Sequence, residues 1–365
     1  MRVVHLTSLH PPDDVRIFLK ECRSLAHAGY DVHLVAPGTA NGNRDGVAIH
    51  TFALPAGLRP LRVLRRLWRA WRATRKLRPY VCQFHEPELV LVALVLKLQG
   101  ARVVYDVHEH HAAAVGHSAY RGGGRRLGFR LLEAIARRTC EAFVAATPAI
   151  ASEFPADRTV AVLNYPLPEE FVESPRPAAE RHEVVYVGGV TRSRGAREMV
   201  EAVGLLGGNS RLVLIGPFDD PELEREVQAL EGWSRVEHTE RLGRDGVAER
   251  LAAARVGLVV LHPEPDFLRS IPIKLFEYMS AGLPVIASDF PYWRELLEPI
   301  ECASFVDPLD SSRIAGAIEE LLADEDRATE MGRRGATAVR ERLNWEREAP
   351  KLLELYGRLG LPAAA

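Results

Sequence analysis

The sequence predicts an α/β protein made of two similar halves, each built on a parallel sheet with helices on both faces. Strand-like and helix-like segments alternate over residues 3–163, and this pattern predicts such a sheet. The alternation stops at 164–168, where Pro166 and Pro168 cannot continue a helix or a central strand, and it restarts at residue 184. The length of 365 residues also agrees with two domains rather than one.

The elements of the first half follow from runs and periods of apolar residues. In the helix expected over 15–28, Phe18, Cys22 and Leu25 lie on one face, and Gly29 is placed to end it in a left-handed conformation. We expect strands over 3–6, 30–36, 81–84, 103–106, 142–146 and 160–163, and helices over 61–77, 89–99, 128–141 and 148–154.

The second half repeats the same alternation without an exact internal repeat. We expect strands over 184–187, 211–215, 236–238, 256–261 and 284–287, and helices over 196–206, 222–230, 246–254, 311–323, 327–341 and 345–359. A further helix is expected just before Gly282.

Composition excludes several classes of protein. The net charge of −2 argues against a general nucleic-acid binder. The four cysteines are scattered without metal-ligand spacing, which favours a reducing, cytoplasmic compartment. No secretory signal is evident, and the longest apolar run, 89–98, is too short to span a bilayer. The sequence has neither the glycine-rich turn of a dinucleotide fold nor a Walker A motif.

The most informative stretch is 270–288. Lys274 and Glu277 are three residues apart and share one face of a helix, beside the crevice at which a parallel sheet binds ligands. A lysine and a carboxylate there suit an anionic, hydroxyl-rich ligand. The plainer alternative is a core helix with one surface ion pair.

A second stretch, 186–195, ends a strand in Gly188 and Gly189 and then places Arg192 and Arg194 before a helix. Glycines let a ligand approach the backbone, and arginines bind diphosphates bidentately. The alternative is an ordinary charged loop.

Both stretches resemble the donor-sugar motifs of retaining glycosyltransferases of the GT-B fold, specifically family 4. The resemblance implies two Rossmann-like domains facing across a cleft. The first, 1–165, would bind the acceptor, the second, 166–345, would bind the nucleotide sugar, and a final helix, 346–365, would pack back on the first. The implied activity is transfer of a hexosyl group from a nucleotide diphosphate sugar, more commonly a UDP-sugar, to a hydroxyl acceptor with retention. Such acceptors occur in polysaccharide, glycoconjugate or metabolite glycosylation.

The resemblance also implies roles for individual residues. Glu277 would bind the ribose hydroxyls, and Arg192, Arg194 and Lys274 would neutralise the diphosphate. The remaining donor contacts would come from Gly188, Gly189, Ser270, Ile271 and Leu275. Because positively charged side chains would stabilise the negative charge of the leaving diphosphate, we expect no metal requirement and no cofactor. The adjacent pairs at 13–14 and 219–220 look like turn residues rather than an Asp-x-Asp motif.

The chain departs from the family pattern at two positions. Arg269 stands where the family usually has a second glutamate, and Gly189 stands where an arginine often follows the first glycine. Glu264 or Asp266 are candidates to replace that glutamate. The departure leaves the donor sugar open and motivates two alternatives: a non-catalytic sugar-nucleotide-binding subunit and a GT-B epimerase.

The first half supplies candidates for the sugar and the acceptor. His108 follows the strand expected over 103–106 and resembles the family's cleft histidine, a catalytic position; a zinc site within 108–111 is the alternative. Asp14, Arg16, Glu86 and Glu109 are candidate acceptor residues, although Asp14 also suits a helix cap.

The helix expected over 61–78 is strongly basic, with leucines and tryptophans between its arginines. Such a helix suits peripheral contact with the inner face of a membrane, and a lipid-linked acceptor would follow. The alternative is a solvated charged face over a packed one.

Overall fold

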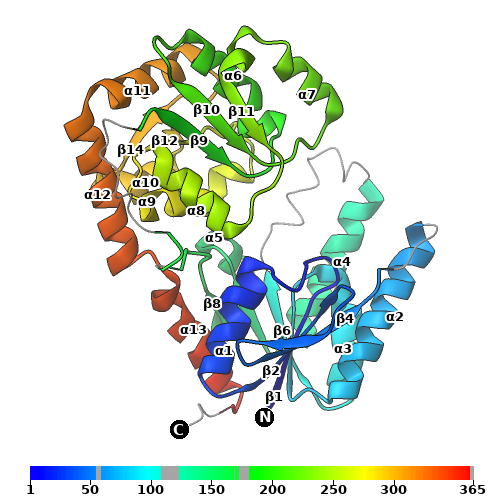
Figure 1. The fold of residues 1–365 in the computed structure, drawn as a ribbon. Helices are drawn as coiled ribbons and strands as arrows, with labels where there is room; N and C mark the ends of the chain where they lie inside the picture. The colour runs from blue at the N-terminus through cyan, green and yellow to red at the C-terminus, as the bar shows by residue number, and fades with distance from the viewer. Residues whose placement is uncertain (55–58, 108–122, 168, 172–180, 362–365) are drawn as a thin grey trace. The chain divides into compact units, whose positions relative to one another are not determined.

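The computed structural model describes residues 1–54, 59–107, 123–167, 169–171 and 181–361, and the chain forms two compact units (Figure 1). Unit 1 comprises Met1–Asn164 and Trp345–Ala365, and unit 2 comprises Tyr165–Asn344. Each unit is a predominantly parallel sheet flanked by helices. The predicted fold class, two Rossmann-like α/β units, is confirmed.

The sheet of unit 1 has the strand order β3-β4-β2-β1-β5-β6-β7-β8, and only the β3–β4 pair is antiparallel. The strands are β1 (Arg2–Leu6), β2 (Asp31–Pro37), β3 (Gly42–Arg44), β4 (Val47–Phe52), β5 (Val81–Phe84), β6 (Arg102–Val107), β7 (Ala142–Ala145) and β8 (Thr159–Ala161). Strand order reverses beside β1, whose two neighbours are β2 and β5.

One face of this sheet packs on α2 (Arg59–Leu77), α3 (Val90–Leu98) and α4 (Gly123–Thr139) through an apolar core. The first helical segment of the chain, Val15–Cys22, is a π-helix rather than an α-helix. It contacts α1 (Arg23–His27) and α13 (Trp345–Arg358). The short α5 (Pro148–Ala151) leads into β8.

Successive residues of the central strands of unit 1 alternate between an apolar and a polar face. Val4, Phe84 and Tyr105 belong to the apolar core against α2, α3 and α4. Because side chains alternate along a strand, His5 and Asp106 point to the opposite face. This polar face carries a buried cluster of charged and hydrogen-bonding groups.

The sheet of unit 2 is entirely parallel, with the order β11-β10-β9-β12-β13-β14. Its strands are β9 (Glu183–Val187), β10 (Arg211–Ile215), β11 (Val236–Thr239), β12 (Ala254–Val259), β13 (Val285–Ser288) and β14 (Ala303–Val306). Its helices are α6 (Ala196–Leu205), α7 (Pro221–Gln228), α8 (Arg244–Ala253), α9 (Ile273–Ser280), α10 (Pro291–Leu297), α11 (Ser311–Ala323) and α12 (Glu325–Glu341).

The helix α13 belongs to unit 1, although it follows unit 2 in the sequence. The indole Nε1 of Trp345 donates to Ser24 Oγ at 2.8 Å, and the Tyr356 hydroxyl donates to Gln83 Oε1 at 2.7 Å. Unit 1 is therefore built from two separate stretches of the chain.

Candidate donor-binding site

The residues predicted to bind a donor lie where the strand order of unit 2 reverses. β9 is flanked by β10 on one side and by β12 on the other. The loop after β9 holds Gly188–Gly195, and the segment after β12 leads through Ser270 into α9. In open parallel sheets, ligands bind beyond the carboxyl ends of the strands at such a reversal.

The turn after β9 depends on glycine at two positions. Gly188 has φ 131°, which L side chains rarely adopt, and a Cβ on Gly188 would stand 2.6 Å from Lys274 Nζ. Gly195 has φ 75°, and a Cβ there would meet the carbonyl oxygen of Val260 at 2.4 Å. The sequence therefore keeps backbone, rather than side chain, in front of Lys274.

Lys274 is a buried amine that makes no hydrogen bond to any residue that the structure describes. Its side chain projects from the first turn of α9, is 8% exposed, and places Nζ 3.8 Å from the ring centroid of Tyr186. Within the described parts of the chain, Nζ has no acceptor within hydrogen-bonding distance. Burial, together with the charge of Arg194, holds the pKa of Lys274 well below its ordinary value, while Glu277 opposes the shift.

Arg194 and Arg192 take different positions. Arg194 Nη1 approaches the carbonyl oxygen of Gly189 at 3.4 Å, so its guanidinium lies over the glycine turn. Tyr186 also donates to that carbonyl, at 2.9 Å. Arg192 instead points to solvent and pairs with Glu226 at 2.6 Å. Of the two arginines, only Arg194 lies over the glycine turn and acts on the charge of Lys274.

Glu277 is buried and does not pair with Lys274, so the alternative of a surface ion pair within α9 is wrong. Glu277 Oε1 accepts from Arg244 Nη1 at 2.9 Å, and Arg244 also pairs with Glu170. Arg244 begins α8, and its guanidinium lies 4.9 Å from the ring centroid of Phe171. Sequence analysis missed this arginine, because it lies 33 residues from Glu277 and carries no local signal.

The remaining predicted donor residues, Ser270, Ile271 and Leu275, lie in the turn that leads into α9 and in the first turn of that helix. Ser270 Oγ donates to Asp266 O at 2.8 Å, and Ser270 O accepts from the indole of Trp293 at 2.7 Å. Ile271 is half-buried, whereas Leu275 is a core residue whose N–H already donates to Pro272 O at 3.1 Å. These contacts fix the turn into α9.

In the structure, Asp14 and Arg16 make contacts within the fold of unit 1. Asp14 caps the π-helix, accepting from the backbone N–H groups of Arg16 and Ile17. Arg16 is 5% exposed and pairs with Asp106 at 2.9 Å and Glu21 at 3.1 Å. An acceptor contact predicted for either residue would have to displace these bonds.

Glu86 is held at the end of β5 by donors from the loop after β1. It accepts from Thr7 Oγ1 at 2.5 Å, from Ser8 N at 2.9 Å and from His10 at 2.8 Å. Burial alone would raise the pKa of Glu86, but these hydrogen bonds outweigh it and hold the pKa below its usual value. His108 and Glu109 lie outside the described residues.

Comparison with protein families matches both halves of the chain. Residues 181–324 match the family "Glycosyl transferases group 1", and residues 15–166 match "Glycosyl transferase 4-like domain". The chain belongs to the group 1 glycosyltransferases. The predicted resemblance to group 1, family 4-like glycosyltransferases is thereby confirmed.

Curated glycosyltransferases resemble parts of the chain. A phosphatidyl-myo-inositol mannosyltransferase of Mycobacterium leprae is 32% identical over 146 residues, 40% of this chain and 37% of the relative. An alpha-maltose-1-phosphate synthase of Mycolicibacterium smegmatis is 30% identical over 193 residues, 48% of each protein. The chain thus spans less than half the length of these two relatives.

Solved structures show the same fold over nearly the whole chain. The sucrose-phosphate synthase of Thermosynechococcus elongatus has a TM-score of 0.79 at 20% identity, with 99% of each chain covered. The Anabaena protein HepE in complex with UDP-glucose has a TM-score of 0.74 at 16% identity, covering 98% of this chain and 100% of that one. Both comparisons support the GT-B fold of this glycosyltransferase.

Proposed function

We propose that this glycosyltransferase moves a hexosyl group from a nucleotide diphosphate sugar to a hydroxyl acceptor, with retention of anomeric configuration. The observation that carries the donor assignment is Lys274, a buried amine that faces a glycine turn and has no acceptor among the residues described. A buried charge is unfavourable unless it is paired, and a diphosphate would supply the missing oxygens.

The diphosphate would lie over Gly188 and Gly189, between Lys274 and Arg194. Departure of the nucleoside diphosphate builds negative charge on its oxygens, and fixed cations stabilise that charge most strongly in the transition state. We therefore expect transfer without a catalytic divalent ion. Transfer rates measured with and without added Mg²⁺ test this expectation, and a rate that depends on Mg²⁺ would contradict it.

The ribose would bind to Glu277. Arg244 donates to one carboxylate oxygen, which would leave the second oxygen to accept hydrogen bonds from the ligand. With the carboxylate positioned in this way, two vicinal ribose hydroxyls would be the matching donors. The sugar would then lie near the turn at Ser270 and Ile271.

The nucleobase of the donor is tested by offering the protein both a uridine and a guanosine nucleotide. A Mycobacterium tuberculosis relative is named as GDP-mannose-dependent, and HepE was solved with UDP-glucose. We favour a UDP-sugar. We expect UDP to raise the melting temperature of the purified protein in a concentration-dependent manner, because a ligand that binds only the folded state stabilises it. The shift should disappear in Lys274→Met, and the absence of a shift with any nucleoside diphosphate would overturn the donor assignment.

Retention is tested on the product. With a suitable alcohol acceptor, proton NMR of the fresh product should show the anomeric configuration of the donor. A product of inverted configuration would overturn the proposed mechanism.

A non-catalytic sugar-nucleotide-binding subunit is the second candidate, and Arg269 favours it. This residue is exposed at the end of the short turn Phe267–Arg269, where the family usually has a glutamate. Slow hydrolysis of the donor by purified protein, lost in Lys274→Met, would decide for the enzyme. Conversion of the donor sugar without any acceptor would instead indicate an epimerase.

We further propose that α2 contacts an anionic membrane surface, which would suit a lipid-linked acceptor. Leu61, Leu64 and Trp68 are 49%, 63% and 50% exposed on this helix, and exposed arginines at 62, 65 and 72 accompany them. Large apolar side chains among arginines match the interface of an anionic bilayer. Among the helices that the structure describes, none combines the length and apolar character needed to cross a bilayer.

Sedimentation with vesicles tests the membrane contact. Binding to phosphatidylglycerol vesicles should exceed binding to phosphatidylcholine vesicles, weaken with salt, and fall in Leu64→Ser/Trp68→Ser. The control is Leu205→Ser, a leucine that is 57% exposed on α6. Equal binding by the double variant and the control would exclude α2 as the contact.

A further inference from the structure

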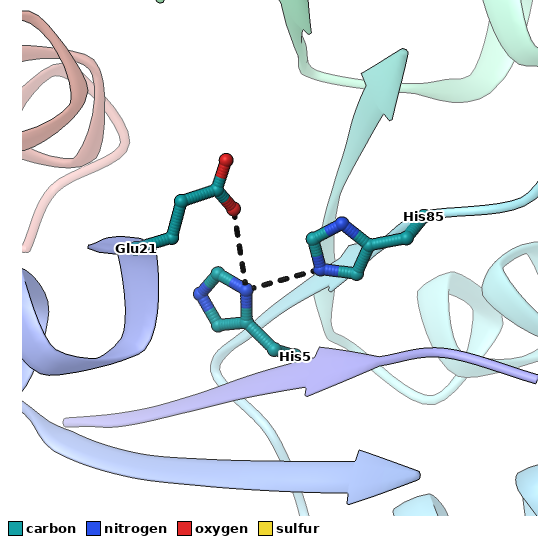
Figure 2. A group of neighbouring side chains, drawn as sticks. All are labelled: His5, Glu21 and His85. Atoms are coloured by element: carbon teal, nitrogen blue, oxygen red, sulfur yellow. Dashed lines mark hydrogen bonds and ion pairs between the residues drawn. The ribbon is translucent and has the colours of Figure 1, made fainter. Parts of the chain in front are cut away.

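A group of three ionisable side chains is buried in unit 1, where β1 and β5 lie side by side. His5 comes from β1, His85 directly follows β5, and Glu21 comes from the π-helix (Figure 2). His5 Nδ1 lies 3.2 Å from His85 Nε2 and 3.7 Å from Glu21 Oε2. All three side chains are inaccessible to solvent.

The hydrogen bonds of His85 fix its tautomer. His85 Nδ1 lies 3.0 Å from Asp106 Oδ2, and Arg16 binds both oxygens of that carboxylate, at 3.2 and 2.9 Å. A carboxylate paired with arginine is ionised and accepts only. His85 Nδ1 therefore carries the proton, and Nε2 presents a lone pair to His5.

The partners of His5 fix its tautomer in the same way. Gln83 Nε2 donates to Glu21 Oε2 at 2.7 Å, which orients the amide, and the Tyr356 hydroxyl donates its single proton to Gln83 Oε1 at 2.7 Å. Toward His5 Nε2, at 3.4 Å, the Tyr356 oxygen is left as an acceptor. His5 thus carries its proton on Nε2, and its Nδ1, like Nε2 of His85, presents a lone pair.

Two imidazole lone pairs and one carboxylate oxygen therefore converge on the same buried point. We propose that His5 Nδ1, His85 Nε2 and Glu21 bind a late first-row divalent metal ion, with Zn²⁺ as the representative case. Two histidines and one carboxylate are a common donor set for such ions. Metal–nitrogen bonds of about 2.0–2.1 Å in tetrahedral geometry set ligand atoms about 3.3 Å apart, close to the 3.2 Å observed between the two rings.

Hydrogen bonds from outer partners agree with this assignment. Asp106 binds the other ring nitrogen of His85, Tyr356 contacts the other ring nitrogen of His5, and Gln83 donates to the carboxylate of Glu21. The ion would join β1, β5 and the π-helix, and it has no part in the donor chemistry of unit 2.

A second pair of stacked histidines in unit 1 provides the matched control. His33 Nδ1 lies 2.8 Å from His50 Nε2, and the ring centroids are 5.1 Å apart, compared with 5.3 Å for His5 and His85. His50 is half-buried, and Asp31, the carboxylate partner of His33, binds the ring nitrogen that faces away from His50. Among the described residues, this pair therefore has no third ligand at the point between the rings.

Metal content and spectroscopy test the proposal on the full chain. Because the site is closed to solvent, the protein is unfolded, refolded with Zn²⁺ or Co²⁺, and freed of loose metal by gel filtration. We expect about one ion per chain and, with Co²⁺, visible absorption typical of four-coordinate cobalt. His5→Gln and Glu21→Gln should lose this ion, whereas His50→Gln should keep it.

A variant that retains all three ligands guards against misfolding as an explanation. Tyr356→Phe removes the hydroxyl that accepts from His5 Nε2 and donates to Gln83 Oε1, and it should weaken zinc affinity about 10- to 100-fold. Folded wild-type protein that takes up no metal would overturn the proposal and place a shared proton between the rings. Unchanged affinity in Tyr356→Phe would overturn the tautomer argument on which it depends.

Discussion

In unit 1 the buried guanidinium of Arg16 contacts Asp106, Glu21 and the carbonyl oxygen of Val162. In unit 2 the buried amine of Lys274 lies against the ring of Tyr186, and no acceptor in the described part of the chain reaches it. Both residues were predicted to contact substrates. The difference separates a cation whose bonding capacity is used by the fold from one whose capacity is left for a ligand. Four experiments test this distinction, beginning with the largest expected effect.

Arg16→Met should destabilise the protein most. Removing this guanidinium leaves Asp106 and Glu21 buried without their partner, and breaking a buried ion pair costs about 3–5 kcal/mol of unfolding free energy. Denaturant unfolding followed by circular dichroism measures the loss. Arg192→Met is the control, because its ion pair with Glu226 lies in solvent and should contribute little. Equal stability of the two variants would mean that Arg16 does not hold the fold.

Lys274→Met should act in the opposite sense, on catalysis rather than on stability. The variant removes a buried amine whose hydrogen-bonding capacity is unused among the described residues, so the melting temperature should stay the same or rise. The value of kcat/KM for the donor should fall about 10²- to 10³-fold, as expected for losing one electrostatic contact to the transition state. A variant that loses stability but keeps full activity would show that Lys274 holds the fold and does not bind the donor.

Glu277→Ala should raise the KM for the donor about 10- to 100-fold, because hydrogen bonds to a charged group contribute about 1.5–3 kcal/mol. A donor that carries 2′-deoxyribose provides the matched test. The wild type should bind this donor more weakly than the normal one, and Glu277→Ala should not distinguish the two. If the variant still distinguishes them, Glu277 does not bind that hydroxyl.

The smallest effect is proton uptake upon donor binding. Because burial holds the pKa of Lys274 well below that of the unfolded chain, the unfolded state binds more protons between the two values, and this residue makes stability rise with pH there. A bound diphosphate would raise the pKa again, so binding should take up protons and weaken as pH rises. Calorimetry of UDP binding in buffers of different ionisation enthalpy measures the uptake, and Lys274→Met should abolish it.

Apolar patterning predicted most of the elements, because buried parallel strands are short apolar runs between turn residues. It missed β3 and β4 at the sheet edge, where Gly42–Arg44 is fully exposed and Val47–Phe52 is largely half-buried. It also missed α10 and β14, since Pro291 and half-buried positions weaken their patterns.

The candidate site was predictable only in part. Lys274 and Gly188 come together as expected, because strand ends of a parallel sheet meet at one edge. The Arg244–Glu277 pair is a long-range contact without a local signal. The contacts of Arg16 were not predicted, because the sequence indicated an ordinary helix over 15–28. In the observed π-helix, i→i+5 hydrogen bonds bring residues five apart together, and Arg16 pairs with Glu21.

The placement of α13 determines the order in which the protein is completed during synthesis. Unit 2 is one continuous stretch, so it can fold as soon as Tyr165–Asn344 has left the ribosome. Unit 1 begins first but finishes last, because Trp345 and Tyr356 complete contacts with Ser24 and Gln83. Until then, the polar face of its sheet lacks one of its covering helices. A nascent chain stalled before residue 345 should therefore expose unit 1, and not unit 2, to proteolysis.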